Sequence, residues 1–183
     1  MTSNRARLLD EYLVAAARTG DGKAFAILVE RWSGKLIAHA WRLTGDREAA
    51  RDAAQGAWVE IVRGLGRLKD ERAFPAWAFR IVTRRCARHV GERVREREIA
   101  GQLADQPAVV ADDPGAGVDA QRLRVAIARL PSDQKSAVAL FYLEEMSVAE
   151  VAVALSVPAG TVKTRLMHAR RKLCAALEGD DNA

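Results

Sequence analysis

Apolar residues along the chain recur mainly at intervals of three and four positions, the spacing that places them on one side of a helix. No segment of the sequence alternates apolar and polar residues as a half-buried strand does, and no repeat of solenoid length is present. The pattern therefore predicts an all-α protein, in which two small helical domains are joined by an irregular stretch.

The first domain is expected to comprise residues 1–97 and four helices. Asp21 is placed to cap the second helix and Asp46 the third, because a carboxylate there accepts hydrogen bonds from the unpaired amides of the first turn. The fourth helix is predicted to begin near Phe74-Pro75, since proline suits a first helical turn. The buried stripe of the third helix is predicted to comprise Ala50, Ala54, Ala57, Ile61 and Leu65.

The segment 98–118 has a different character, because it contains proline, glycine and acidic residues but few large apolar ones. Such a composition is typical of a flexible linker. Two interpretations are open: the segment is a solvated tether, or its acidic residues occupy a basic channel in a partner. The helical pattern then resumes over residues 119–178, and the chain ends in a short tail, 179–183.

The second domain is expected to begin with a short apolar stripe and to continue with three further helices. Ser147 and Glu150 have the spacing of a capping box, in which each side chain bonds the backbone amide of the other residue. Ser156 is expected to cap the last helix. The first stripe is predicted to comprise Leu123, Ile127 and Leu130. The stripe of the last helix is predicted to comprise Val162, Leu166, Ala169 and Leu173.

The stretch from Ser147 to Leu173 has the pattern of a helix-turn-helix: a short helix, a tight connection, and a second helix with one apolar side. In such motifs the free face of the second helix offers donors to base edges and phosphates. A basic helix that is merely solvated is the alternative, but cap, turn, stripe and charge all favour DNA binding. The candidate contact residues are Thr161, Lys163, Thr164, Arg165, Met167, His168 and Arg171.

The fourth helix of the first domain carries a second basic surface. Arg80, Arg84 and Arg88 recur every four residues and so form one ridge. Like charges at this spacing repel one another, and a phosphate backbone would relieve the repulsion. Trp77 lies one turn earlier, where it either stacks on an unpaired base or belongs to the core. Two DNA-binding surfaces joined by a linker predict two DNA elements at a constrained distance.

Composition and charge further limit the possible partners and functions of the protein. The 183 residues carry a formal net charge of +5, which favours a polyanionic partner. Cys86 and Cys174 lack metal-ligand spacing and are expected to be reduced thiols of a cytoplasmic protein. The sequence has no apolar run of membrane-spanning length and no signal-peptide pattern. Its histidines are isolated, and no nucleophile triad or phosphate-binding loop is present, so neither a cofactor nor an enzyme is predicted.

With these features in place, the chain resembles a bacterial RNA polymerase sigma factor of the extracytoplasmic-function (ECF) type over about residues 8–177. GTVKTRL (160–166) followed by HARRKL (168–173) is similar to the family's region 4, which reads the −35 promoter element. GDREAARDAAQGAWVEIVRGL (45–65) resembles the helix with which such factors grip polymerase. FPAWAFRIVTRR (74–85) resembles the segment that opens and reads the −10 element.

The resemblance implies a promoter-specificity subunit whose partners are promoter DNA, core RNA polymerase and an anti-sigma factor, without membrane insertion. Its contacts on polymerase would be the clamp helices of the largest subunit and the flap of the second-largest. The residues implied to bind polymerase are Asp52, Gln55 and Trp58. Those implied to bind the −10 strand are Arg67, Lys69, Arg72, Trp77, Arg80, Arg84 and Arg88. At the −35 element, the implied base readers are Lys163, Thr164, Met167 and His168. The implied phosphate contacts there are Thr161, Arg165 and Arg171.

The chain departs from the usual family pattern at several positions. The family commonly has an acid and a phenylalanine at the positions of Gly56 and Trp58, and Asn and Asp at those of Arg84 and Arg88. A turn glycine is usual at Ser156 and an arginine at the position of His168.

Two other functions fit parts of the pattern. A stand-alone helix-turn-helix regulator would bind DNA without polymerase, normally as a symmetric dimer, but it leaves the first domain unexplained. A sigma mimic that sequesters an anti-sigma factor would keep the fold without needing a DNA-binding face. The basic last helix argues against such a mimic.

Overall fold

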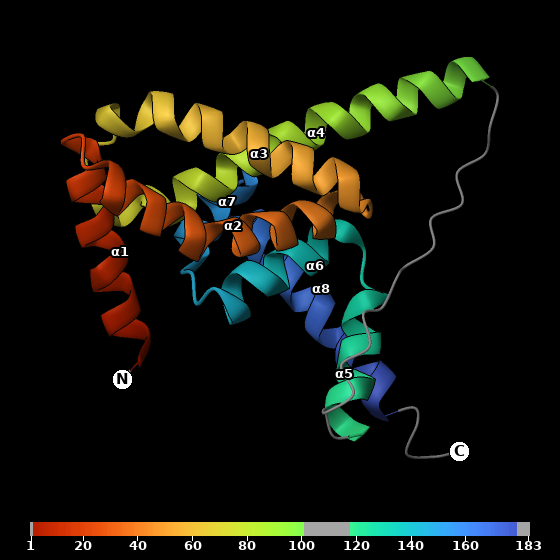
Figure 1. Ribbon diagram of the computed structural model, residues 1–183. Coiled ribbons are helices and arrows are strands. Elements are labelled where there is room, and N and C mark those ends of the chain that lie inside the picture. Colours follow the sequence, from red (N-terminus) through yellow and green to blue (C-terminus); the bar gives the residue numbers. More distant parts are fainter. Residues whose placement is uncertain (1, 101–117, 179–183) are drawn as a thin grey trace. The chain divides into compact units, whose positions relative to one another are not determined.

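The computed structural model describes residues 2–100 and 118–178, so the central part of the predicted linker, residues 101–117, and the tail, 179–183, lie outside the described residues. In the described ranges all regular elements are helical and none is a strand, which confirms the all-α prediction (Figure 1). The chain divides between Arg95 and Glu96 into two compact units, except that Val153–Ser156 groups with the first.

Unit 1 is the N-terminal helical unit. Its four α-helices are α1 (Thr2–Arg18), α2 (Gly22–Thr44), α3 (Arg47–Gly64) and α4 (Phe74–Ala100). Two short 3-10 turns, η1 (Leu65–Arg67) and η2 (Glu71–Ala73), connect α3 to α4. Helices α2 and α3 lie side by side, and α1 packs against the first part of α2 (Figure 1). Helix α4 continues to Ala100, beyond residue 97, where the first domain was predicted to end.

The starts of α2 and α3 follow from local chemistry. The Asp21 carboxylate accepts hydrogen bonds from the amides of the first turn of α2, and Asp46 does the same for α3. Between the two helices, Gly45 takes a left-handed conformation with φ 68°, and its amide donates to the carbonyl of Trp41 at 2.8 Å. Glycine adopts this conformation without the steric penalty that a Cβ brings. Both predicted caps are confirmed.

The core of unit 1 lies between α2, α3 and α4. The α3 residues predicted to be buried are all buried. Most of them are alanines, and small side chains allow α2 to approach α3 closely. From α2 and α4 the core receives larger groups, among them Trp32, Leu36 and Phe79. His39 is also fully buried there, which the sequence pattern did not predict.

Unit 2 contains α5 (Val118–Ala128), α6 (Ser132–Val138), the π-helical turn η3 (Ala139–Leu143), the first part of α7 (Val148–Leu155) and α8 (Ala159–Glu178). Helices α5 and α6 both pack against α8. The prediction that Leu123 is buried is wrong, because its side chain is 40% exposed, whereas Ala126 and Leu130 are buried. Spacing indicates which side of a helix is apolar, but it does not indicate how far along that helix a neighbour extends.

The capping box at the start of α7 is confirmed in both directions. The Glu150 carboxylate accepts from the Ser147 amide at 2.7 Å, and the Ser147 hydroxyl accepts from the Glu150 amide at 3.2 Å. The second bond caps the first turn of α7, and the first bond ties Ser147, the residue before the helix, to that turn.

The prediction that Ser156 caps the last helix is wrong. Ser156 instead ends α7, with φ 55°, and α8 begins at Ala159. The amides of Ser156 and Val157 donate to the carbonyls of Val153 and Ala152, which is the bond pair of a Schellman motif. This is the conformation in which glycine is favoured, and it accounts for the difference between this chain and the family pattern at that position.

Replacement of Ser156 by glycine is expected to raise the free energy of unfolding by about 0.5–1 kcal/mol. Glycine removes the strain of a Cβ in the left-handed region, and the larger freedom of the unfolded chain offsets part of that gain. The measurement is urea unfolding followed by far-ultraviolet circular dichroism. Ser156→Ala is the control, because alanine keeps the Cβ and should bring no gain. A glycine variant no more stable than the alanine variant would contradict the explanation.

In residues 2–100 and 118–178 no helix has the length and apolar character needed to cross a membrane. The same ranges contain no cluster of His, Cys, Asp and Glu side chains suited to a metal ion.

Candidate nucleic-acid interface

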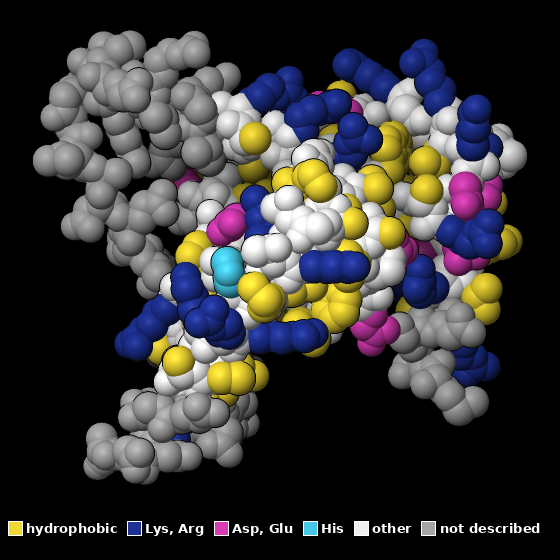
Figure 2. All heavy atoms as spheres, turned by 180° about the vertical axis from the view of Figure 1, so that it is seen from behind, with side chains coloured by type: hydrophobic (Ala, Val, Ile, Leu, Met, Phe, Trp, Pro, Cys, Tyr) yellow, Lys and Arg dark blue, Asp and Glu magenta, His cyan; other side chains and the backbone are white. Residues whose placement is uncertain are grey.

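The exposed face of α8 is the first candidate surface. Val162, Leu166 and Ala169 are buried on its inner side, as predicted, whereas Leu173, the last residue of the predicted stripe, is only half-buried. The predicted base-reading residues all lie on the outer side and are exposed; they are Lys163, Thr164, Met167 and His168. Arg171 is exposed as well, and Figure 2 shows basic side chains gathered along this helix. One helix therefore presents an apolar side to unit 2 and a basic, hydrogen-bonding side to solvent.

Two of the predicted −35 residues have internal contacts that the sequence did not reveal, and a third is partly buried. The guanidinium of Arg165 forms an ion pair with Asp133 at 3.1 Å and is mostly covered. The Thr164 hydroxyl donates to the carbonyl of Gly160 at 3.1 Å, one turn earlier in α8. Thr161 is half-buried at the start of the helix. The side chains most available to an incoming ligand are therefore those of Lys163 and of the exposed residues that follow it on α8.

Arg170 has a partner on another element of unit 2. Its Nε donates to the hydroxyl of Tyr142 at 2.7 Å, and its guanidinium lies 5.8 Å from the centroid of the Tyr142 ring. The bond and the cation–π contact together restrict Arg170 on the flank of α8. Tyr142 was not a candidate at the level of sequence, because the pair is formed by residues 28 positions apart.

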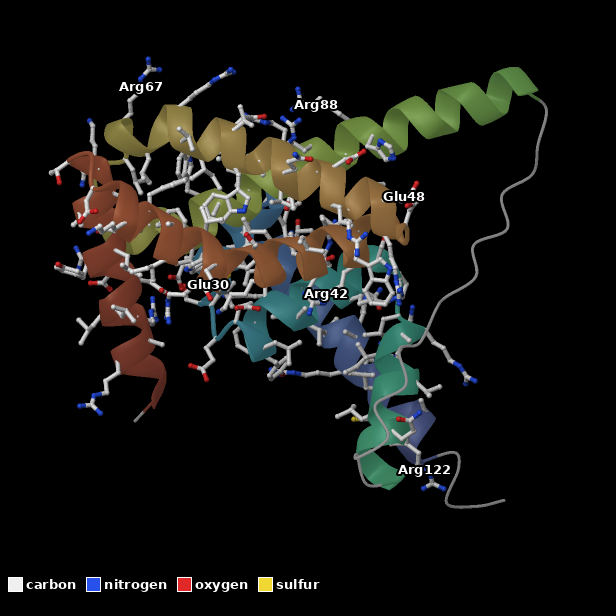
Figure 3. All side chains as sticks on the ribbon, in the orientation of Figure 1. Glu30, Arg42, Glu48, Arg67, Arg88 and Arg122 are labelled. Atoms are coloured by element: carbon white, nitrogen blue, oxygen red, sulfur yellow. The ribbon has the colours of Figure 1, made fainter. Side chains whose placement is uncertain are left out.

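The second candidate surface is the arginine ridge of α4, made of Arg80, Arg84 and Arg88. All three side chains are exposed. Arg88 extends away from unit 1, on the same side as Arg67 at the end of η1 (Figure 3). Within the described residues, Arg80 forms no ion pair or hydrogen bond through its side chain. The ridge predicted from the four-residue spacing is therefore present on the surface.

Glu60 of α3 pairs with the ridge, a contact that the sequence analysis missed. Its carboxylate bonds Arg84, and it also accepts from Arg85 at 2.6 Å and from Arg88 at 3.4 Å. Burial alone would raise the pKa of Glu60, but the hydrogen bond from Arg85 and the charges of Arg84 and Arg85 outweigh it and lower that pKa. The carboxylate thus remains ionised among three cations.

Gly56 leaves the space that Arg85 fills. A Cβ at this position would collide with the Arg85 guanidinium where that side chain now lies. The absence of a side chain at Gly56 thus allows Arg85 to lie against the backbone of α3 and to reach Glu60. This contact gives a structural reason for a residue that differs from the family pattern.

The connection between α3 and α4 carries Arg67, Lys69 and Arg72, all exposed. Arg72 pairs with Asp70 at 3.1 Å, and the side-chain and backbone hydrogen bonds from Arg72 lower the pKa of the Asp70 carboxyl. Glu71 pairs with Arg18 of α1, which ties the connection to the rest of unit 1. The three cations are therefore displayed on a short, anchored segment.

Trp77 is held in part by the core. Its ring packs edge-on against Phe74, with 6.3 Å between centroids, and it lies over Gly64, where a Cβ would come within 2.8 Å of the ring. The side chain is half-buried and keeps some solvent contact. Trp77 is therefore partly a core residue, and its stacking on a base stays a prediction.

The outer face of α3 is the candidate polymerase-binding surface. Asp52 and Gln55 are exposed on it. Trp58 is half-buried and turned toward α2, where its Nε1 donates to the Ser33 hydroxyl at 3.1 Å. Two valines that the sequence analysis did not select are exposed beside Asp52 and Gln55; they are Val59 (46%) and Val62 (56%). The sequence held a signal for them, because Val59 and Val62 follow Gln55 by four and seven residues and so share its side of α3, outside the buried alanine stripe.

Comparisons with known proteins agree with this arrangement. The family description "Sigma-70 region 2" matches residues 28–96, and "Sigma-70, region 4" matches residues 120–173. The ECF RNA polymerase sigma factor SigM of Mycobacterium tuberculosis strain H37Rv is 32% identical over 169 residues, which cover 92% of this chain and 84% of SigM. The RNA polymerase sigma-H factor of Pseudomonas aeruginosa is 27% identical over 186 residues, with 92% and 94% covered.

A solved structure shares the fold. The sigma factor RpoE from Bartonella quintana, crystallised in complex with the anti-sigma factor NepR, superposes with a TM-score of 0.73 at 22% sequence identity. The match covers 85% of this chain and 98% of that one. Because SigM is related along most of the chain, and regions 2 and 4 follow one another in the expected order, this chain belongs to the sigma-70 family as an RNA polymerase sigma factor of the ECF type.

Proposed function

We propose that residues 1–97 bind core RNA polymerase and the −10 element, that residues 119–178 bind the −35 element, and that 98–118 link the two. The observation that carries this assignment is the presence of a basic exposed surface on each unit, one on α4 and one on α8. Since each unit displays its own surface, one chain can hold two promoter elements at once.

In unit 2, α8 lies in the major groove of the −35 element. Lys163, Thr164, Met167 and His168 face base edges, where a lysine suits guanine acceptors and an apolar methionine suits a thymine methyl group. Thr161 and Arg171 contact phosphates. The exposure of the four base-facing side chains supports this assignment. Arg165 contacts phosphate from beside Asp133, which orients its guanidinium.

Lys163→Ala is expected to change the −35 preference, with a loss of about 1–3 kcal/mol at one base position, because a lost base contact affects only that position. Arg165→Ala is expected to weaken binding to all sequences by a similar factor, since it removes a phosphate contact. Binding of the polymerase holoenzyme to a panel of −35 variants measures both. A uniform loss for both variants would refute Lys163 as a base reader. Asp133→Asn is the control that frees Arg165 without removing it.

In unit 1, the ridge and the η1–η2 connection hold the separated −10 strand. Arg80, Arg84 and Arg88 follow its phosphates, while Arg67, Lys69 and Arg72 surround a base that has left the stack. Trp77 stacks on a neighbouring base through its exposed edge. The common direction of Arg67 and Arg88 in Figure 3 supports one continuous path for the strand.

The outer face of α3 docks on the clamp helices of the largest polymerase subunit, and unit 2 contacts the flap of the second-largest. Asp52 and Gln55 supply polar contacts, and the exposed Val59 and Val62 add the apolar surface that a stable interface needs. Trp58 supports this face from beneath through its bond to Ser33. An anti-sigma factor is a further partner, as it is for the RpoE that shares the fold.

The decisive experiment is run-off transcription with purified core polymerase and candidate promoters, including the promoter of the chain's own gene. Transcripts that start only when the chain is present support the proposal. No product from any candidate promoter would overturn it. A gel shift separates the stand-alone regulator from the sigma factor, because strong specific binding by the chain without polymerase would favour the regulator.

A further inference from the structure

Three arginines of α4 converge on a single carboxylate of α3. One oxygen of Glu60 bonds Arg84, and the other accepts from Arg85 and, at longer range, from Arg88. The Glu60 side chain is 27% exposed, so it lies between the two helices rather than in open solvent. One carboxylate faces three guanidinium groups, so the cluster retains a net positive charge. Its best-placed hydrogen-bond acceptor, the Glu60 carboxylate, is already occupied.

The three arginines are not equivalent. Arg85 is 31% exposed and lies against Gly56, so it is held by packing as well as by charge. Arg84 and Arg88 are each 60% exposed and turn other donor hydrogens to solvent. Arg80, one turn before Arg84, has no such counter-ion among the described residues. The ridge therefore consists of one unpaired cation and two that are partly neutralised.

We propose that Glu60 is an internal competitor for DNA phosphate, which occupies Arg84 and Arg88 until a strand displaces it. The inference rests on the proposed binding of the −10 strand to the ridge. Exposed ion pairs contribute little net stability, so a phosphate can replace the carboxylate at Arg84 and Arg88 without unfolding α4. Arg85 keeps its bond to Glu60 throughout, because it is the least exposed of the three arginines and packs over Gly56.

The competition has a defined electrostatic consequence. While Glu60 is ionised, the ridge attracts a nucleic-acid strand with about one unit of charge less than its arginines would supply. Binding by the free chain is then weak, and Arg80 makes the first contact. When polymerase and the −35 contact hold the strand in place, the local phosphate concentration is high. Replacement of the Glu60 carboxylate by a phosphate at Arg84 and Arg88 then becomes favourable.

The test is binding of a fluorescent single-stranded oligothymidine to the full chain, followed by anisotropy over a range of salt concentrations. Glu60→Gln keeps the size of the side chain and removes its charge. It is expected to bind about three- to tenfold more tightly at low salt. The slope of log affinity against log salt should become steeper by about 0.7, the value for one additional charge on a single strand.

Glu48→Gln is the matched control. It makes the same change of charge on the same helix, at the first turn of α3 (Figure 3). Glu48 precedes Glu60 by twelve residues, which is about 18 Å along the helix axis. Glu60→Ala is a second test variant, which removes the carboxylate without adding an amide and should act like Glu60→Gln. Tryptophan fluorescence during urea unfolding verifies that the variants remain folded.

Tighter binding by both Glu60 variants than by Glu48→Gln, with the steeper salt dependence, supports the competitor. Equal binding by Glu60→Gln and Glu48→Gln overturns it, and so does weaker binding by Glu60→Gln. Arg80→Ala distinguishes this result from a failure of the proposed function. If Arg80→Ala weakens binding while the Glu60 variants match the control, only the competitor is refuted. If Arg80→Ala has no effect either, the ridge itself does not bind the strand.

Discussion

Replacement of Phe79 by alanine is expected to lower the free energy of unfolding of unit 1 by about 3–5 kcal/mol. The Phe79 ring is fully buried, and its centroid lies 5.7 Å from that of Trp32 and 5.1 Å from that of His39. Truncation removes these aromatic contacts and leaves a cavity that the closely packed neighbours on α2 and α4 fill only in part. A loss of this size is a large share of the stability of a small domain.

Urea unfolding followed by tryptophan fluorescence measures this effect in unit 1 alone. All four tryptophans belong to that unit; they are Trp32, Trp41, Trp58 and Trp77. Ile27→Ala is the control, because Ile27 lies on α2 with 46% of its side chain exposed and should change stability by less than about 1 kcal/mol. Similar losses for the two variants would contradict a central role for Phe79.

Lowering the pH from 7 to 5 is expected to destabilise unit 1 by about 2 kcal/mol through His39. Burial, with a smaller contribution from the charge of Arg42, lowers the pKa of His39 from 6.5 to about 3. The unfolded chain therefore takes up the proton near pH 6.5, while the folded ring stays neutral. The stability that comes from the neutral ring is complete above pH 6.5 and is lost progressively as the pH falls toward 3.

The hydrogen bonds of His39 explain why the folded chain resists protonation. The Thr83 hydroxyl donates to the Phe79 carbonyl at 2.9 Å, so it accepts from Nε2–H of the ring, also at 2.9 Å. Nδ1 is buried and has no hydrogen-bond partner among residues 2–100 and 118–178. A proton added to Nδ1 would place a charge in the core with no acceptor, which is strongly unfavourable.

His39→Leu is expected to remove this pH dependence. Leucine has a similar volume, so stability at pH 7 should change by no more than about 1.5 kcal/mol, while the difference between pH 7 and pH 5 should become small. His168→Leu is the control, since it replaces an exposed histidine of unit 2. The readout is urea unfolding at each pH, followed by tryptophan fluorescence. If His39→Leu leaves the pH dependence of the parent chain unchanged, His39 is not its source.

Most of the structure that neighbouring residues decide was predicted correctly from the sequence. The caps of α2 and α3 and the capping box of Ser147 and Glu150 each join residues within one helical turn, and all are present. The buried stripes of α3 and α8 also follow from helical periodicity alone. The region 2 and region 4 resemblances rest on continuous motifs, which is why they were recognisable without a structure.

Prediction failed where two local motifs compete for one residue, or where a packing neighbour decides burial. A serine before a helix usually caps it, but Ser156 is drawn into the left-handed conformation that ends α7, because the Schellman bonds satisfy the carbonyls of that helix. The stripe that contained Leu123 was placed on the correct side of α5, yet its first residue is exposed. Neither outcome is encoded by the spacing of apolar residues.

By itself, the sequence determined that this protein is all-helical, that it carries two basic surfaces, and that it has the motifs of an ECF sigma factor. Only the tertiary structure decided which cations remain available, because ion pairs such as Glu60 with Arg84 and Asp133 with Arg165 join residues distant in sequence. It likewise decided that His39 is buried and uncharged. Helical periodicity specifies the side on which a residue lies, whereas charge pairing and burial depend on which other helix packs against that side.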